Sequence, residues 1–67
     1  MMRIVFFDKK RETYISVGDV VQLDNILIKS NGRYTNFWGI VKLDGTKETF
    51  KQKDYTIHRI EIRRRVK

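Results

Sequence analysis

Apolar and polar residues alternate along most of the chain, with the two-residue period that is typical of half-buried β-strands. Residues 3–7 and 12–16 form the first two such runs, and a charged break at residues 8–11 separates them. No segment of ten or more residues has a helical period, and the chain contains neither proline nor alanine, the best helix former. The pattern therefore predicts an all-β protein that begins with two short strands.

The middle of the chain is marked by turn residues. Gly18-Asp19 suits a sharp corner, because glycine tolerates unusual φ angles and aspartate bonds to its own backbone. The segment that follows, residues 20–28, fits either one long, bent strand or two short strands around Asp24-Asn25. Ser30-Asn31-Gly32 then predicts a tight turn before the next strand.

Residues 34–50 predict a β-hairpin. Asp44-Gly45 lies between two runs of strand-forming residues and suits the positive φ angles of a two-residue type I′ turn. The pairs expected for such a loop are Leu43 with Thr46, Val41 with Glu48 and Gly39 with Phe50.

This register gives the hairpin two different faces, because alternate residues of a strand point to opposite sides. The predicted core face carries Phe37, Val41, Leu43 and Phe50. The predicted outer face carries Trp38, Ile40, Lys42, Lys47 and Lys51. Gly39 suggests a bulge or a strong bend, and a bulge there would exchange Phe37 with Trp38.

The end of the chain predicts one more strand. Ile57 is out of phase with Ile60 and Ile62, and a turn over residues 54–57 would restore the alternation before a strand at residues 58–63. Strands this short, joined by tight turns, predict a five- to six-stranded antiparallel SH3-like barrel or a strongly curled sheet. We expect a single domain over residues 1–62 and a basic tail at residues 63–67.

The order of these elements resembles that of SH3-like small barrels. The resemblance rests on VGDVVQL at residues 17–23, the turn after it, the aromatic-rich strand, the Asp-Gly hairpin and the last strand. It covers roughly residues 17–63 and is shared by KOW, Tudor and small chromatin-protein barrels. It implies a small barrel fold, and a fold alone assigns no function.

The net positive charge of the chain indicates a negatively charged partner. Fifteen Lys and Arg residues against eight Asp and Glu give a net charge of +7, which steers and concentrates polyanions. Nucleic acid, either DNA or RNA, is the partner that we expect. An acidic protein or an anionic surface also fits the charge, and solubility alone is the simplest alternative. The apolar run at residues 4–7 is too short for a signal peptide or a membrane span, so we expect a cytoplasmic protein with no membrane partner.

Catalysis and metal binding have little support in the residues. His58 is the one imidazole, and the lack of cysteine excludes Cys/His metal sites. The aspartates at predicted turns have turn-forming roles, and they are Asp19, Asp24, Asp44 and Asp54. The four glycines are isolated and form no phosphate-binding loop. We therefore expect no enzymatic activity and no cofactor.

The outer face of the predicted hairpin is the candidate nucleic-acid surface. Trp38 offers a stacking platform, and the lysines beside it can neutralise phosphate. The alternative for Trp38 is a place in the core. Arginines at the end of the chain suit bidentate contacts to the phosphate backbone. The predicted binding residues are Tyr34, Trp38, Ile40, Lys42, Lys47, Lys51, Arg59, Arg63, Arg64 and Arg65.

A protein-interaction module is the alternative function. An unpaired edge at the last strand or at residues 20–28 could add to another chain's sheet, giving a homo-oligomer or capturing a protein partner. Small basic proteins also act as inhibitors of larger complexes, as in the takeover of a host by a phage. The loop cluster Lys9-Lys10-Arg11 could contribute to nucleic-acid binding, and the alternative is that it is only solvated, as charge clusters in loops usually are.

Overall fold

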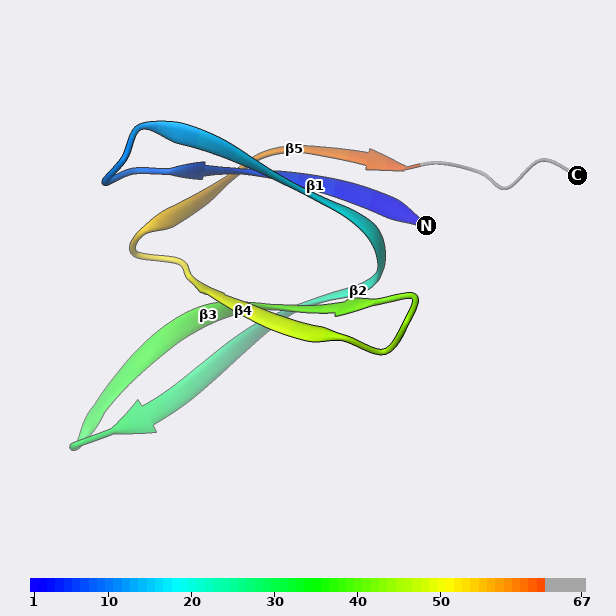
Figure 1. The fold of residues 1–67 in the computed structure, drawn as a ribbon. Coiled ribbons are helices and arrows are strands. Elements are labelled where there is room, and N and C mark those ends of the chain that lie inside the picture. The colour runs from blue at the N-terminus through cyan, green and yellow to red at the C-terminus, as the bar shows by residue number, and fades with distance from the viewer. Residues whose placement is uncertain (63–67) are drawn as a thin grey trace, which may run out of the picture.

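The computed structural model describes residues 1–62 as one antiparallel sheet of five strands, drawn in Figure 1. The strands are β1 (Met2–Asp8), β2 (Thr13–Ser30), β3 (Arg33–Lys42), β4 (Lys47–Lys51) and β5 (Tyr55–Ile62). Their order across the sheet is β4-β3-β2-β1-β5, so β4 and β5 are its two edges. The predicted all-β architecture is confirmed in its curled form, because the sheet does not close into a barrel.

The bend of β2 divides the sheet into two layers. The strand runs unbroken for 18 residues, so the single long strand is the correct alternative. Gly18-Asp19 lies inside it, at a bulge opposite β1, and Asp19 adopts a positive φ of 55°. In Figure 1, β2 leaves the layer of β1 and β5, turns, and continues in the layer of β3 and β4. The Asp19 carbonyl oxygen accepts a hydrogen bond from the Leu43 N–H at 2.8 Å, which fixes the bend against the β3–β4 turn.

The core lies between the two layers. Its buried side chains come from β1, β2 and β3, and they are Ile4, Phe6, Val17, Val20 and Ile40. Aromatic residues pack against this cluster, among them Trp38 of β3 and Phe50 of β4. A chain this small buries a limited core, so these rings add to a short list of aliphatic residues.

The β3–β4 turn differs from the prediction. Its loop has three residues, Leu43, Asp44 and Gly45, closed by hydrogen bonds from the Gly45 N–H to the Lys42 carbonyl and from the Lys42 N–H to the Thr46 carbonyl, both at 2.9 Å. Gly45 has a positive φ of 89°, and Asp44 is not among the residues with positive φ. This is a turn with a glycine bulge rather than a type I′ turn.

The longer loop shifts the hairpin register by one residue. Trp38 lies opposite Phe50, and Ile40 lies opposite Glu48. A shift of one residue moves every side chain to the other face of a strand. The predicted faces were wrong for Ile40, which is 1% exposed and belongs to the core, and for Leu43, which is 56% exposed, whereas Phe50 packs against the core as expected.

Gly39 is not a bulge, because the β3–β4 pairing runs without interruption through it. A Cβ atom at Gly39 would lie 2.2 Å from the Cδ1 atom of Ile26, which covers this glycine from β2. The absence of a side chain at Gly39 therefore leaves room for the Ile26 side chain. A bulge that was not predicted lies at His58 of β5, opposite the step from Val5 to Phe6. It restores the phase of the isoleucines, and the predicted turn over residues 54–57 is wrong because β5 begins at Tyr55.

Asn31-Gly32 forms the two-residue turn that joins β2 to β3. Both residues have positive φ, 51° and 75°, and Ser30 lies opposite Arg33. These are the features of a type I′ turn, which suits the twist of the flanking strands. The tip of this hairpin projects beyond the rest of the sheet in Figure 1. We call residues 26–36 the hairpin arm.

Candidate nucleic-acid interface

Three connections lie on the same side of the molecule. They are the β1–β2 loop, the β4–β5 turn and the tip of the hairpin arm, and Figure 1 shows all three on the side away from the β3–β4 turn. The Lys9 N–H donates to the Asp54 carbonyl at 2.9 Å and joins the first two connections. The Gln52 N–H donates to the Asn36 carbonyl at 3.0 Å and joins the β4–β5 turn to the arm.

Cationic side chains gather on these connections. They are Lys9, Lys10, Arg11, Lys29, Arg33, Lys51 and Lys53, and we call this set the basic end. The acidic residues on the same connections are Asp8, Glu12 and Asp54. Around the β2 bend and the β3–β4 turn the charges cancel: Asp19, Asp44 and Glu48 stand beside Arg3, Lys42 and Lys47. Within residues 1–62 the excess of positive charge therefore lies at the basic end, and such a field steers anions toward it.

Two acidic residues of the basic end have structural partners. Asp8 is buried, and its Oδ1 atom accepts hydrogen bonds from the backbone N–H groups of Lys10 at 3.0 Å and Arg11 at 3.2 Å. This side chain organises the loop that carries the cations. The Lys10 Nζ atom lies 3.9 Å from Asp54, a contact long enough and exposed enough to leave the lysine available.

The hairpin arm adds an aromatic surface. Tyr34 is 63% exposed, and the Lys29 Nζ atom lies 5.5 Å from its ring centroid. The two residues face each other across β2 and β3. A cation held over the ring leaves most of the phenol open to a second flat partner. Leu27, on the same face of the arm, is also exposed.

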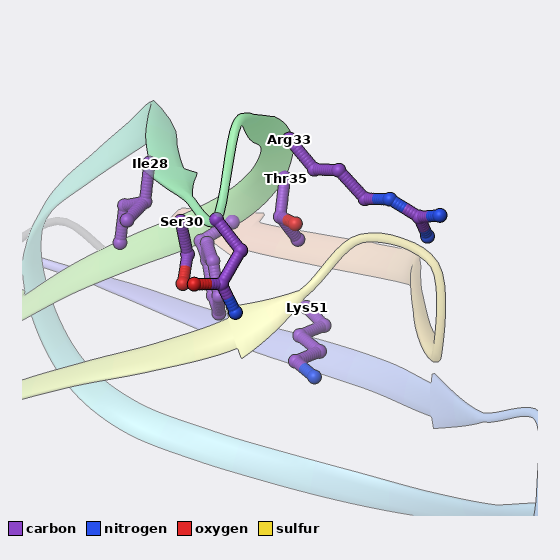
Figure 2. A pocket seen from close by; sticks show the side chains of 7 residues that line it. Ile28, Ser30, Arg33, Thr35 and Lys51 are labelled. Carbon is purple, nitrogen blue, oxygen red and sulfur yellow. The ribbon is translucent and has the colours of Figure 1, made fainter.

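Two hollows border the arm, and Arg33 and Thr35 line both. The first has a volume of about 490 Å³ and lies on the outer face of the sheet, where Figure 2 shows Ile28 and Ser30 of β2, Thr35 of β3 and Lys51 of β4 around it, with Arg33 extending away. The second has a volume of about 470 Å³ and lies between the arm and the β4–β5 turn. Its lining is polar and basic, and consists of Arg33, Tyr34, Thr35, Asn36, Gln52 and Lys53.

Gln52 fixes the distance between this turn and the arm. Its Nε2 atom donates to the Asn25 Oδ1 atom at 2.6 Å and lies 3.4 Å from the Phe37 carbonyl oxygen. The Gln52 N–H also bonds to the Asn36 carbonyl. These direct contacts hold the β4–β5 turn against the arm, so that Lys53 and Tyr34 line the same hollow. The second hollow is therefore a preformed concave surface with an aromatic wall.

The structure separates several of the predicted site residues. Lys47 and Lys51 share the outer face with Phe37 and Val41, which take the places expected for Trp38 and Ile40. Lys42 points to the other face and pairs with Glu48 at 3.8 Å. Arg59 lies on β5, where its Nε atom contacts Glu61 at 2.9 Å. Arg63, Arg64 and Arg65 lie outside the described residues.

Trp38 and Ile40 do not form the outer surface that the hairpin register predicted, because both side chains pack on the core side of β3. The sequence analysis did not single out Lys29, Arg33 or Lys53, and gave Lys9-Lys10-Arg11 only as a secondary group. One signal was available: lysine or arginine accompanies the β1–β2, β2–β3 and β4–β5 connections alike. That these connections share one end follows from the strand bend, which the residues alone did not locate.

Two further kinds of site were sought in the described part of the chain, a metal centre and a membrane-spanning helix. Residues 1–62 contain no group of three or more His, Asp or Glu side chains that could hold a metal ion. No helix that could span a membrane occurs among the described residues. No protein-family model, curated protein or solved structure matches this chain.

Proposed function

We propose that the protein binds nucleic acid, DNA or RNA, through the basic end and the hairpin arm, without strong sequence specificity. The observation that carries the proposal is the placement of seven cationic side chains on connections at one side of the molecule, with Lys29, Arg33 and Lys53 beside the exposed Tyr34. In this proposal these cations form the polyanion site. We propose binding without catalysis.

In this proposal, the phosphate backbone follows the three connections. Lys9, Lys10 and Arg11 contact phosphates on one side of the β4–β5 turn, and Lys29 and Arg33 contact them on the other. Each neutralised phosphate releases counterions, so affinity falls steeply with salt. Contacts of this type read the backbone and carry no base information.

Tyr34 supplies the base contact. Its ring forms a wall of the second hollow, next to Lys53, where an unpaired base can stack while its phosphate meets the lysine. Stacking contributes about 1–3 kcal/mol per base and tolerates any base, because every base has a flat π-face. An exposed ring of this kind favours single-stranded over double-stranded nucleic acid, since the bases of a duplex are already stacked.

A fluorescence anisotropy titration tests the proposal. A dye-labelled single strand of mixed sequence is titrated with the natural chain at low and at moderate salt. The same titrations are made with the double variant Lys29→Gln/Lys53→Gln. The control is the double variant Lys42→Gln/Lys47→Gln, which removes the same charge from the other end of the molecule. We expect binding that weakens with salt, and a loss of roughly tenfold or more for the first variant, because it removes two phosphate contacts. Absence of binding at low salt, or equal losses for the two variants, would contradict the proposal.

A further inference from the structure

The two edges of the sheet differ in how they are protected. β4 has five residues and carries exposed Lys47 and Lys51, a short and charged edge of the kind that discourages pairing with another strand. β5 has eight residues, and no described strand pairs with its outer side. Ile60 and Ile62 on this strand are 44% and 80% exposed, so the open edge is also apolar.

The charges of β5 lie in a simple arrangement around Ile60. Arg59 and Glu61 flank it and point to the same face, opposite Val5 and Arg3 of β1. Ile60 points to the other face, opposite Ile4. Ile62 continues this apolar row, where it helps to line a hollow of about 240 Å³ with Met2, Val20 and Val21.

We propose that two copies of the chain pair through β5, antiparallel, about a twofold axis at Ile60. In an antiparallel pair, directly opposite residues point to the same face, so a symmetric β5 pair must be centred on a residue. A centre at Ile60 places Arg59 of each copy opposite Glu61 of the other. A centre at Arg59 or at Glu61 would bring like charges face to face, which is destabilising.

The proposed pair has both polar and apolar components. Two Arg59–Glu61 contacts form on one face, where each residue already lies 2.9 Å from its neighbour within the copy, so the four charges form one network. On the other face the two Ile60 side chains meet. The backbone groups of two β5 edges satisfy each other, and the pair becomes a continuous ten-stranded sheet. This inference is independent of the proposed nucleic-acid binding.

Charge reversal in a mixture tests the pairing. Arg59→Glu places two glutamates on β5, and Glu61→Arg places two arginines there; each variant alone puts like charges opposite each other. We expect each to dimerise roughly tenfold or more weakly than the natural chain, and an equimolar mixture to recover a dimer of one copy of each. Neither variant retains the Arg59–Glu61 contact within a copy, so recovery reports only the contact between copies. Sedimentation velocity without nucleic acid gives the readout, and circular dichroism checks folding.

Cysteine cross-linking tests the register directly, because the natural chain has no cysteine. Ile60→Cys places the two thiols directly opposite, where the Cα atoms are about 4.5–5.5 Å apart and a disulfide can form. The control, Ile62→Cys, places them roughly 13 Å apart along the strands. We expect oxidised Ile60→Cys to run as a cross-linked dimer and Ile62→Cys not to. The inference would be overturned by a natural chain that is monomeric even in the millimolar range, or that forms an assembly larger than a dimer. It would also be overturned if the mixture of charge-reversed variants stays monomeric, or if cross-linking occurs only through Ile62→Cys.

Discussion

The ring of Phe6 on β1 stacks on the ring of Phe50 on β4, with centroids 4.5 Å apart and an angle of 28° between the planes. These two strands are not neighbours in the sheet, so the contact joins the two layers across the interior. Tyr55 packs edge-on against the same Phe50 ring at 5.2 Å. An open, curled sheet keeps its shape through such contacts, since it lacks the hydrogen bonds that close a barrel.

Phe50→Ala therefore tests how the layers are held. The variant removes the stacked ring and leaves a cavity between the layers, and we expect it to lower the free energy of unfolding by about 2–4 kcal/mol. Phe37→Ala is the matched control, because Phe37 lies on the outer face of the neighbouring strand. We expect it to cost about 1 kcal/mol or less, since its ring is not in the core. Urea unfolding followed by circular dichroism gives both values, and equal costs would contradict the two-layer account.

Trp38 provides a second test of the inward face. Its indole Nε1 atom is buried and has no hydrogen-bond acceptor among the described residues. Such an unpaired donor costs about 1–3 kcal/mol, so removing it offsets part of the lost volume. We expect Trp38→Phe to lower stability by roughly 1 kcal/mol or less, and Trp38→Ala to lower it by about 3 kcal/mol. Thermal unfolding of the two variants decides; a Trp38→Ala protein as stable as the natural chain would show that the ring is not part of the core.

Gly39 and Ile26 should be energetically coupled. A methyl group at Gly39 would collide with the end of the Ile26 side chain, which must then move. We expect Gly39→Ala to cost about 1 kcal/mol alone. In an Ile26→Ala background both the Cδ1 atom and the Cγ1 atom, which would lie 3.0 Å from the new methyl group, are absent, and we expect the same change to be neutral or slightly stabilising, because alanine loses less backbone entropy than glycine. A double-mutant cycle by urea unfolding measures the difference, and strict additivity of the two changes would refute this contact.

The β3–β4 turn predicts a dependence on pH. Hydrogen bonds from the side chain and the backbone N–H of Thr46 lower the pKa of the Asp44 carboxyl below its usual value of 3.8, and Lys42 acts in the same direction. A carboxyl with a lowered pKa in the folded state stabilises the fold above its unfolded pKa, and this contribution is lost as the pH falls through the folded pKa. An NMR titration should give Asp44 a midpoint below 3.8, and Thr46→Val should move it upward. A midpoint at or above the usual value would contradict the turn geometry.

Much of the architecture could be predicted from the residues. The alternation of apolar positions indicated strands throughout, Asn31-Gly32 marked its turn, and Gly18-Asp19 marked the corner of β2. The register of one hairpin could not be predicted, because Asp-Gly suits both a two-residue type I′ turn and a three-residue turn with a glycine bulge. The choice depends on burial: the three-residue loop puts Trp38, Ile40 and Phe50 inside and leaves only Leu43 exposed.

The candidate interface had a different difficulty. Its lysines and arginines are far apart in the sequence, and each taken alone is an ordinary exposed residue of a loop or of a strand end. They share one end because β2 bends at Gly18-Asp19 and brings the β2–β3 tip to the same side as the β1–β2 loop. Local patterns report strands and turns well, whereas a surface made by a bend in the middle of an 18-residue strand depends on the whole fold.

The measurement that tests the central claim most directly is an NMR titration of the isotopically labelled protein with a short single-stranded oligonucleotide. We predict that the amide signals of Lys10, Lys29, Tyr34 and Lys53 shift together and saturate at one stoichiometry, while those of Asp44 and Thr46 at the other end stay in place. We also predict that added salt reverses these shifts. Shifts centred on the β3–β4 turn, or spread evenly over the surface, would contradict a nucleic-acid interface at the basic end.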